Sequence, residues 1–333
     1  MWDMIPSLKI LMICPAPRGS RKGNRVTADR WARLLRELGH EVTIRQLYDD
    51  APCDLMIALH ARRNAAAIRR FARLHPDRPL VVVLTGTDLY RDIRTSRIAQ
   101  RSLELATRLV ILQPKGVDEL RPALRGKTRS ILQSAESTKL RLSRRFATSK
   151  SVFRVCVLGH LRHEKDPLRT AMATRLLPDS SRIKVTHLGK ALTPAMGEWA
   201  RSETLRNPRY DWLGEVARSK ARRILAQSDL MVLSSRMEGG ANVLSEALAD
   251  SVPIIASDIP STEGILGDNY PGLYPTGDTR TLAELLDRAE TNSQFYGRLK
   301  MWCRQLAPLV RPAAEREAWS RLIRELCQRR KPQ

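Results

Sequence analysis

Short apolar runs alternate with amphipathic segments along the first part of the chain, and the two periods predict strands and helices in turn. The runs that predict strands lie at residues 9–14, 41–45, 55–59, 80–85 and 109–113. Apolar residues repeat with helical spacing over residues 27–38, just before Gly39, and again over residues 64–74. Continuous apolar strands separated by amphipathic helices are typical of a parallel sheet covered on both faces, so this part predicts an α/β domain.

A second series of the same kind follows a polar stretch at residues 134–151. It restarts with an apolar run at residues 153–159 and continues through the runs at 184–189, 231–233 and 254–256. A length of 333 residues also suits about two domains better than one core. We therefore expect a first domain over residues 1–148, a second over residues 149–311, and a terminal helical segment over residues 312–333.

Two glutamates eight positions apart, Glu238 and Glu246, belong to the most informative motif of the chain. Gly239 and Gly240 directly follow the first glutamate, and the next helix is expected to begin near Asn242. Glycines let a backbone approach a ligand closely, and a helix start offers N–H groups to anions and hydroxyls. The two carboxylates could hold a nucleotide sugar from both ends, whereas the alternative is two unrelated acids that flank a loop.

Predicted strands on both sides of this motif favour the ligand site. Residues 230–233 read as a buried strand before it, and residues 252–257 read as another after it. In such βαβ units ligands bind at the carboxyl ends of the strands. The block at residues 234–249 resembles the glutamate-x7-glutamate region of family-4 glycosyltransferases, which are retaining enzymes with the GT-B fold of two Rossmann-like α/β domains and a cleft between them.

This resemblance implies roles for the residues of the motif. Glu238 would contact the transferred sugar, and Glu246 would bind the ribose of the donor. The backbone between them would bind sugar and phosphate through Gly239, Gly240, Ala241 and Asn242. The resemblance also implies that the helix within residues 312–333 crosses back to the first domain.

A basic loop follows the first strand of the second domain. Family-4 enzymes carry a glycine, an arginine, a short gap and a lysine here, and the two cations neutralise the leaving diphosphate. Lys165 matches the lysine, but His160 occupies the arginine position and Arg162 lies two positions later. Whether His160 or Arg162 is the second cation is left open by the sequence, and a solvated basic turn is the alternative.

The loop at residues 15–25 of the first domain has neither the GxxxxGK[ST] nor the GxGxxG order. In family-4 enzymes a Gly-Gly pair touches the donor phosphate at this place. Gly23 matches the second glycine, while Lys22 stands in the first position. The charges of Arg18, Arg21, Lys22 and Arg25 would favour an anionic acceptor, and an ordinary solvated basic loop is the alternative.

Two further strand ends of the first domain carry polar residues. His60 follows the strand at residues 55–59 and aligns with a histidine that lies near the sugar in family-4 enzymes; alone, it could equally be a structural histidine. Thr85 and Asp88 follow the strand at residues 80–85. Asp88 could instead cap the start of a helix.

The segments 15–28, 58–63, 84–90 and 234–242 together are similar to the selenosugar synthases of selenoneine biosynthesis, and the similarity extends over nearly the full chain. It implies transfer of N-acetylglucosamine or glucose from a UDP-sugar to selenophosphate, which yields a 1-seleno sugar. The implied catalytic residues are His60, Lys165 and Glu238. The implied donor-binding residues are Gly23, His160, Arg162, Lys165, Glu238, Gly239, Gly240, Ala241, Asn242 and Glu246. The implied acceptor-binding residues are Arg21, Lys22, Asn24, Arg25, His60, Arg62, Thr85 and Asp88.

The net charge of +23 would suit nucleic acid or an anionic membrane surface. Arginines are spread along the whole chain, however, and few aromatic residues lie among them, which argues against nucleic acid. We expect small-molecule partners only. The alternative within the same class is a transferase for a lipid or polysaccharide acceptor, with the arginine-rich segment 62–74 on an anionic membrane.

Cysteine spacing and acidic motifs indicate neither a metal nor a cofactor. The five cysteines, Cys14, Cys53, Cys156, Cys303 and Cys327, form no CxxC pair, and the site motifs contain no DxD pair. No apolar run approaches the roughly 20 residues that span a bilayer. Residues 1–4 do not resemble a secretory signal, so we expect a cytoplasmic enzyme without stable membrane insertion.

Overall fold

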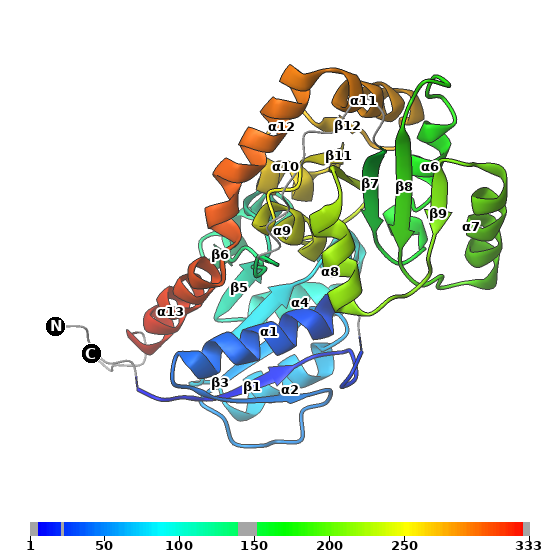
Figure 1. Cartoon of the computed structure of the whole chain (residues 1–333). Helices are drawn as coiled ribbons and strands as arrows, with labels where there is room; N and C mark the ends of the chain where they lie inside the picture. The colour runs from blue at the N-terminus through cyan, green and yellow to red at the C-terminus, as the bar shows by residue number, and fades with distance from the viewer. Residues whose placement is uncertain (1–5, 21–22, 139–151, 329–333) are drawn as a thin grey trace. The chain divides into compact units, whose positions relative to one another are not determined.

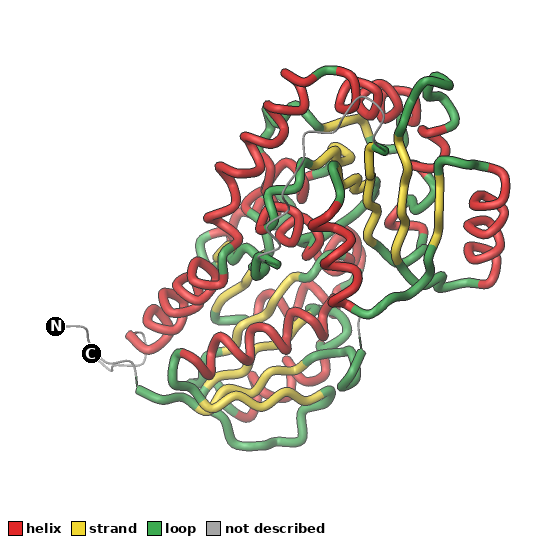
Figure 2. The backbone as a smooth tube through the Cα atoms, in the orientation of Figure 1, coloured by secondary structure: helices red, strands yellow, loops and turns green. Residues whose placement is uncertain are grey.

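A computed structural model describes residues 6–20, 23–138 and 152–328 of the protein. The chain divides into two compact units (Figure 1), of which the first comprises Met1–Gln133 with Pro312–Gln333 and the second comprises Ser134–Arg311. The expected domain boundary between residues 148 and 149 lies outside the described residues. In each unit strands lie between layers of helices, as the tube in Figure 2 shows.

The first unit contains a six-stranded parallel sheet in the order β2-β1-β3-β4-β5-β6. Its strands are β1 (Lys9–Ile13), β2 (Glu41–Arg45), β3 (Leu55–Leu59), β4 (Leu80–Leu84), β5 (Arg108–Ile111) and β6 (Thr128–Ser130). Every residue of β3 and β4 is buried, because helices cover both faces of the sheet. The continuous apolar runs therefore predicted the parallel sheet correctly.

Helices on the two faces of this sheet enclose two separate cores. The helical elements are α1 (Gly23–Glu37), α2 (Ala65–Leu74), the π-helical turn η1 (Asp88–Asp92), α3 (Ile93–Thr95), α4 (Arg97–Leu105), η2 (Pro114–Val117), α5 (Pro122–Arg125) and α13 (Pro312–Gln328). Helices α1 and α13 contribute to one core, and α2 and α4 to the other. Helix α1 begins four residues before the expected residue 27, because Gly23, Asn24 and Arg25 at its start carry no apolar side chain that would extend the apolar period.

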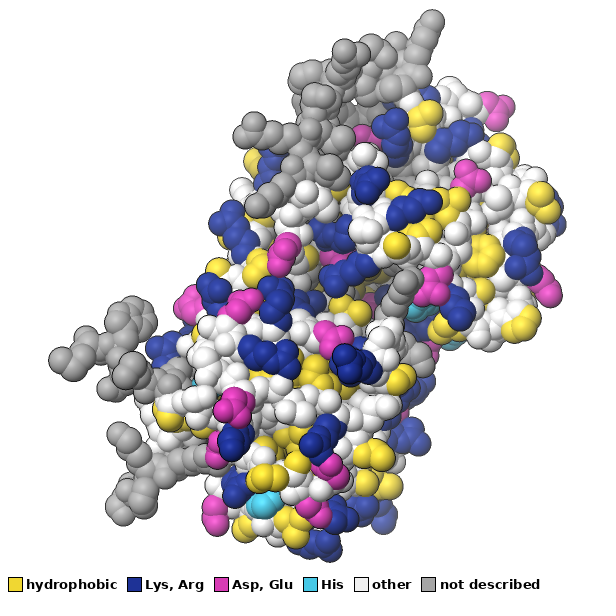
Figure 3. Space-filling model, turned by 60° about the horizontal axis from the view of Figure 1, so that its bottom comes forward, with side chains coloured by type: hydrophobic (Ala, Val, Ile, Leu, Met, Phe, Trp, Pro, Cys, Tyr) yellow, Lys and Arg dark blue, Asp and Glu magenta, His cyan; other side chains and the backbone are white. Residues whose placement is uncertain are grey.

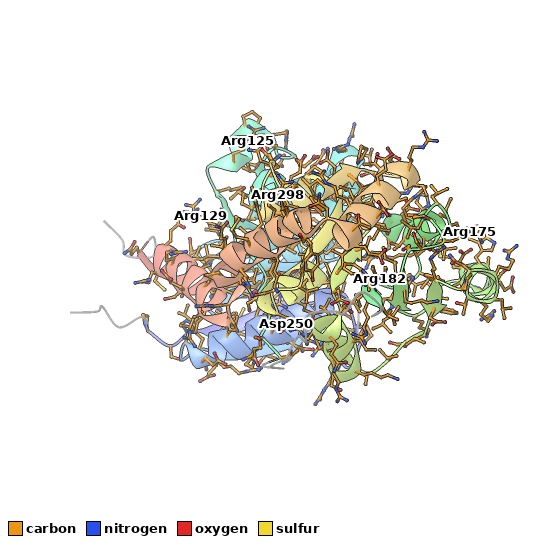
Figure 4. All side chains as sticks on the ribbon, turned by 45° about the horizontal axis from the view of Figure 1, so that its top comes forward. Arg125, Arg129, Arg175, Arg182, Asp250 and Arg298 are labelled. Atoms are coloured by element: carbon orange, nitrogen blue, oxygen red, sulfur yellow. The ribbon has the colours of Figure 1, made fainter. Side chains whose placement is uncertain are left out.

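Helix α13, from the end of the chain, packs within the first unit. Its Trp319 is fully buried and meets Trp31 of α1 edge to face, with 4.8 Å between ring centroids. Glu315 accepts hydrogen bonds from Trp31 and Arg30. Near the other end of the helix, the carboxylate of Glu325 accepts from two arginines of the sheet. These are Arg108 at 2.6 Å and Arg129, labelled in Figure 4, at 2.5 Å.

The second unit repeats the design with the strand order β12-β11-β10-β7-β8-β9, again fully parallel. Its strands are β7 (Phe153–Leu158), β8 (Ile183–Leu188), β9 (Tyr210–Trp212), β10 (Leu230–Leu233), β11 (Ile254–Asp258) and β12 (Leu273–Pro275). Its helical elements are η3 (His163–Lys165), α6 (Arg169–Thr174), α7 (Pro194–Arg206), α8 (Arg218–Gln227), α9 (Asn242–Ala249), α10 (Pro260–Leu266), α11 (Thr279–Thr291), α12 (Ser293–Leu306) and η4 (Ala307–Val310). These two parallel sheets with their helices confirm the predicted α/β class.

The order of strands reverses once in each sheet. In the first sheet β1 has β2 on one side and β3 on the other, and in the second sheet β7 lies between β8 and β10. Connections that leave such a point toward opposite faces open a crevice at the carboxyl ends of the two strands. The predicted motifs follow the strands at these points. In the first sheet the loop at residues 15–25 follows β1 and His60 follows β3. In the second sheet the segment at residues 159–165 follows β7 and the segment at 234–242 follows β10.

We expect the replacement Glu325→Ala to lower the free energy of unfolding by about 1–3 kcal/mol, because it leaves the buried guanidinium of Arg108 without its carboxylate. Denaturant unfolding followed by tryptophan fluorescence measures this, since Trp31 and Trp319 lie in the same core. The matched control is Glu317→Ala on the same helix. Its ion pair with Arg321 is 64% exposed on both sides and should contribute about 0.5 kcal/mol or less.

The unfolding free energy that Glu325→Ala loses depends on pH, and the pKa of Glu325 gives the direction. Burial raises the pKa of Glu325. The hydrogen bonds and charges of Arg108 and Arg129 together lower it by more, so the pKa lies below the ordinary 4.5. A lowered pKa in the folded state gives a contribution that is full above 4.5 and is lost as the pH falls through the folded value. A difference between wild type and variant that grows on acidification would contradict this account.

Candidate functional site

A small recess opens at the reversal point of the second sheet. It is lined by Val157, Leu158, Gly159, Lys165, Pro167, His187, Val232, Leu233, Ser234 and Ser235. Its volume of about 10 Å³ is far below the range of roughly 300–1,000 Å³ for sites that enclose a whole small molecule. The recess therefore has room for about one water-sized group, such as a single oxygen of a phosphate.

Lys165 and Glu238 form an ion pair beside this recess, although 73 positions separate them in the sequence. The hydroxyl of Ser235 donates to the same carboxylate oxygen of Glu238 at 2.7 Å. The side chain of Lys165 is only 16% exposed and that of Glu238 only 9%, so the two charges interact more strongly than a surface pair would. The structure thus brings together two of the three predicted catalytic residues.

Ser234 joins the loops that carry this ion pair. Its hydroxyl lies 3.1 Å from the carbonyl oxygen of Lys165 and 2.9 Å from that of Asp166, and it donates to them. The backbone N–H of Arg236 donates to the carbonyl of Glu164 at 2.8 Å. Because both contacts link the end of β10 to the loop after β7, they fix the position of the Lys165 backbone.

The structure gives His160 and Arg162 different chemical states. The Nδ1 atom of His160 accepts a hydrogen bond from the backbone N–H of Lys190 at 3.1 Å, so the ring proton lies on Nε2. Burial lowers the pKa of His160 below 6.5, and the charges of Arg162 and Lys165 lower it further. His160 is therefore neutral at pH 7 and can donate a hydrogen bond but carries no charge. Arg162 is half-buried and remains the cation beside Lys165 in this loop.

The helix after the glycine pair begins at Asn242, as predicted, and Ala241 precedes it as the residue at its N-cap. Gly239 is buried and Gly240 half-buried in the loop before it.

Glu246 lies one turn into this helix and faces two arginines of α8. Arg218 approaches its carboxylate at 3.3 Å and Arg222 at 3.9 Å. Arg222 also donates to Asp250, which is labelled in Figure 4, at 2.8 Å. Glu246 must therefore share its carboxylate between these arginines and any hydroxyl ligand.

The predicted residues of the first loop lie at the start of α1. Gly23, Asn24 and Arg25 form the first turn of the helix, whereas Arg21 and Lys22 lie outside the described residues. This corrects the expectation that Arg25 belongs to a loop, and its guanidinium is paired with Asp29 at 2.8 Å. The first turn contains no acidic side chain, so nothing in it opposes the attraction of the helix N-terminus for anions.

His60 lies at the end of β3 with a backbone φ of 79°, a left-handed conformation that is unusual for a residue with a side chain. The backbone N–H of Arg63 donates to its Nδ1 at 3.3 Å, so Nε2 carries the proton and donates to the hydroxyl of Thr87 at 3.2 Å. Burial lowers its pKa, against the opposing charges of Asp88 and Asp92. His60 is thus a neutral imidazole at pH 7.

Asp88 is fully buried and organises this strand end. Its carboxylate accepts from the backbone N–H groups of Thr85 at 2.8 Å, Gly86 at 2.9 Å and Ala61 at 2.9 Å. It is the first residue of η1, and Thr87 precedes it as the N-cap. Predicted as an acceptor-binding residue, Asp88 holds its oxygens toward the backbone and shapes the loops on which His60 and Thr85 lie.

Arg62 completes the predicted group at this strand end. Its guanidinium lies 3.3 Å from the carboxylate of Asp92, a nearly buried residue that also lies 3.9 Å from His60. The structure therefore gathers His60, Arg62, Thr85 and Asp88 at the carboxyl ends of β3 and β4.

Sequence reasoning missed several residues that position these groups. The amide of Asn64 donates to the carbonyl of Ile13 at 3.0 Å and to that of Leu59, and so joins the ends of β1 and β3 at the reversal point. Asp92, Ser235 and His187 were also overlooked. Ser234 and Ser235 directly follow a predicted strand and could have been found from that signal, whereas His187 lies within a strand and gives none.

The burial of α2 and the pairing of arginines bear on the membrane and nucleic-acid interpretations of the basic charge. The residues of α2 that could have faced a membrane, Ile68 and Phe71, are fully buried against the sheet, which contradicts the idea that this segment lies with them on a bilayer. Several arginines pair within their own unit, such as Arg175 with Glu203 and Arg182 with Glu290 (Figure 4). Basic side chains are spread over the face seen in Figure 3, with acidic ones among them.

In the described part of the chain, no helix is long and apolar enough to cross a membrane. The same residues contain no group of three or more His, Cys, Asp or Glu side chains that could hold a metal ion. None of the five cysteines, all of which lie in the described part of the chain, forms a disulfide bond.

Comparison with known proteins agrees with this geometry. Residues 141–302 match the family model described as "Glycosyl transferases group 1". A Bacillus subtilis (strain 168) protein, described as a glycosyltransferase of teichuronic acid biosynthesis, TuaC, is 25% identical over 276 residues. That match covers 78% of this chain and 67% of the relative.

Solved glycosyltransferase structures share the fold over almost the whole chain. Anabaena Alr3699/HepE in complex with UDP and glucose has a TM-score of 0.70 at 17% identity, covering 96% of this chain and 100% of that one. Sucrose-phosphate synthase (tll1590) from Thermosynechococcus elongatus has a TM-score of 0.72 at 15% identity, covering 96% and 99%. The two units therefore have the GT-B fold of these solved structures, and residues 141–302 match the model of the glycosyl transferases group 1 family.

Proposed function

We propose that this protein is a glycosyltransferase that moves a sugar, N-acetylglucosamine or glucose, from a UDP-sugar to selenophosphate and so makes a 1-seleno sugar for selenoneine biosynthesis. The observation that carries the donor half is the ion pair of Lys165 and Glu238 beside the recess at the end of β7. Structural relatives with UDP, or with UDP and glucose, support the choice of donor. The acceptor half rests on the similarity of four sequence segments to selenosugar synthases.

In the proposed donor site the diphosphate lies against the recess. Lys165 neutralises the charge that develops on it as the bond to the sugar breaks. A cation about 4 Å away contributes roughly 4 kcal/mol at an effective dielectric near 20. Arg162 adds the second charge and the neutral His160 a hydrogen bond. Glu238 keeps Lys165 in place and contacts sugar hydroxyls, while Glu246 exchanges part of its contact with Arg218 for the ribose diol.

In the proposed acceptor site the phosphate of selenophosphate is held by the residues at the start of α1, with His60 and Arg62 nearby in the same unit. The selenium atom attacks C1 of the sugar with its own electron pair, and UDP leaves with the pair of the broken C1–oxygen bond. Water then cleaves the selenium–phosphorus bond and releases inorganic phosphate. Selenium is a soft nucleophile that needs little assistance from a base, so a neutral His60 with both ring nitrogens engaged suits the reaction.

The proposal includes no metal ion or cofactor, and it locates the reaction in the cytoplasm. A polysaccharide or lipid acceptor is the alternative within the same class. The description of the Bacillus relative, which concerns teichuronic acid biosynthesis, is the observation that favours it.

We expect Glu246→Ala to weaken UDP binding about tenfold or more, because the ribose diol loses charge-assisted hydrogen bonds worth roughly 1.5–3 kcal/mol each. Isothermal titration calorimetry of the purified protein with UDP measures this. Glu284→Ala, an exposed glutamate on α11, is the control that should bind UDP normally. Unchanged UDP affinity in folded Glu246→Ala protein would remove Glu246 from the donor site.

We expect Lys165→Ala to lower turnover roughly 100-fold or more, because the leaving diphosphate loses its nearest cation. Arg162→Ala should cost more activity than His160→Ala, since the imidazole is neutral at pH 7. Initial rates at saturating UDP-sugar compare the three variants. Near-normal turnover in all three would identify the loop as solvated surface.

Mass spectrometry tests the acceptor directly. Incubation with UDP-N-acetylglucosamine or UDP-glucose and selenophosphate should give UDP and a 1-seleno sugar. Parallel incubations offer a polysaccharide or lipid-linked acceptor in place of selenophosphate. Transfer to these acceptors with none to selenophosphate would replace the proposed acceptor and leave the donor assignment standing.

Steady-state kinetics of variants in the basic loop at residues 15–25 test the proposed acceptor site. The double replacement of Arg21 and Lys22 by glutamine should raise the KM for selenophosphate far more than that for the UDP-sugar, at about 1–3 kcal/mol per lost contact. Arg33→Gln, an exposed residue of α1 paired with Glu37, is the control for a simple loss of charge. Loop variants that lose donor affinity and keep acceptor affinity would move the selenophosphate site elsewhere in the first unit.

A further inference from the structure

The peptide between Gly159 and His160, just beyond β7, is held firmly on one side. The N–H of Gly159 donates to the carbonyl of Leu188 at 2.9 Å, and its carbonyl oxygen lies 3.2 Å from Nε2 of His187. Two residues later, the N–H of Leu161 donates to the carbonyl of Lys190 at 2.9 Å. Residues 159 and 161 therefore both turn their backbone groups toward the β8 side of the sheet.

Residue 160 must then turn its backbone groups toward the β10 side, because successive residues of a strand bond in opposite directions. The alternation is visible from the start of the strand, where Phe153 bonds on the β8 side and Arg154 bonds on the β10 side. Pairing of β7 with β10 ends at Val157 opposite Val232. Beyond that point the β10 side is occupied by the recess that Ser234 and Ser235 line.

By this alternation the N–H of His160 points toward the β10 side, and Gly159, the other residue of the same peptide, lines the recess. Within residues 6–20, 23–138 and 152–328, no group accepts a hydrogen bond from the N–H of His160. Lys165 lines the same recess. A fixed N–H donor beside an ammonium group is the arrangement that binds a phosphate oxygen.

His187 decides the direction of this N–H, because the C=O and N–H groups of one planar trans peptide point in opposite directions. Nδ1 of His187 lies 2.8 Å from the hydroxyl of Tyr210, which is buried and has its pKa raised by burial, so the phenol keeps its proton and donates it. The ring proton of His187 therefore lies on Nε2 and is donated to the carbonyl of Gly159. Burial lowers the pKa of His187 to about 4, which keeps the ring neutral.

Close packing leaves the peptide little freedom to turn. A Cβ atom on Gly189 would lie 1.9 Å from the carbonyl oxygen of Gly159, so only glycine fits there. The indole of Trp212 donates to the carbonyl of Gly189 at 2.8 Å and fixes that strand end as well. Side chains of β8 and β9 thus determine the orientation of a peptide at the edge of the recess.

We propose that His187, supported by Tyr210, is a positioning residue that holds the 159–160 peptide so that the N–H of His160 binds a phosphate oxygen in the recess. This inference rests on the proposed function for the identity of that phosphate as the diphosphate of the donor. Although His187 helps to line the recess, both of its ring nitrogens bond within the protein and only 1% of the residue is exposed, so it acts through the peptide that it holds. Because His187 holds the peptide, the N–H of His160 is already oriented before a phosphate binds, as in other preorganised hydrogen-bond donors.

Calorimetry with UDP and with uridine tests the inference, because only UDP carries the phosphates. His187→Leu removes the bond to Gly159 and should weaken UDP binding about tenfold or more, with uridine binding unchanged. His187→Gln, whose amide can donate to the same carbonyl, should restore part of the UDP affinity. Tyr270→Phe is the matched control, since Tyr270 is equally buried in this unit but bonds to Ile254, and it should bind UDP normally.

Nuclear magnetic resonance of the ¹⁵N-labelled full chain tests the same point with inorganic pyrophosphate. The amide proton of His160 should shift downfield on titration of the wild type and should respond much less in His187→Leu or, where that variant does not fold, in Tyr210→Phe. A wild type that binds UDP while His187→Leu binds it equally well overturns the inference alone, as does a His160 amide that ignores pyrophosphate. A wild type that responds to pyrophosphate but binds no UDP overturns the proposed donor instead and leaves the inference standing.

Discussion

Parallel strand direction is the constraint from which the arrangement of functional groups in this protein follows. Because every strand of a sheet runs the same way, all carboxyl ends of that sheet lie along one edge, and the segments after them are neighbours whatever their distance in sequence. Lys165 follows β7 and Glu238 follows β10, so 73 intervening positions do not keep them apart. The same logic brings His60 and Thr85 together at the ends of β3 and β4.

Charge in this protein serves packing as well as ligands. The excess of arginine over acidic residues first suggests a polyanion as partner, yet several arginines have partners within their own unit. Arg108 and Arg129 hold the carboxylate of Glu325 and so fasten α13 to the first sheet. A planar guanidinium suits this use because it can donate to one carboxylate in several directions. The net charge alone therefore says little about the ligands of this protein. The partly buried ion pair of Lys165 and Glu238 is more informative, because it lies at one defined place beside the recess.

The α/β class, the parallel sheets and the grouping of polar residues at strand ends could be predicted from the sequence, because they depend on periodicity and on residues that directly follow strands. The start of α9 at Asn242 was placed correctly from the glycine pair before it. The three-residue edge strands β6, β9 and β12 were missed, since runs so short have no detectable period. The start of α1 was placed too late, because its first three residues, Gly23, Asn24 and Arg25, have no apolar side chain to mark it.

Residues that act through other residues were the least predictable. Asn64 lies in an ordinary polar position of the sequence, and only the folded chain shows that its amide joins the ends of β1 and β3. His187 sits inside a strand, where a histidine looks like one more buried residue. The protonation states were equally hidden, since His160 was a candidate cation by alignment and becomes a neutral donor through burial and the charges around it.

The neutrality of three histidines near strand ends has a common physical cause and a common consequence. Burial is the largest influence on the pKa of His60, His160 and His187, and it lowers all three. A buried neutral imidazole has one donor and one acceptor, so a single bond to one nitrogen fixes what the other can do. In each of these residues Nδ1 accepts a hydrogen bond, which leaves the proton on Nε2. Positive charge in the loop after β7 then comes from Lys165 and Arg162, while the neutral histidines supply directed hydrogen bonds. A site built in this way attracts an anion with charged side chains and orients it with fixed dipoles, so that the two tasks depend on different residues.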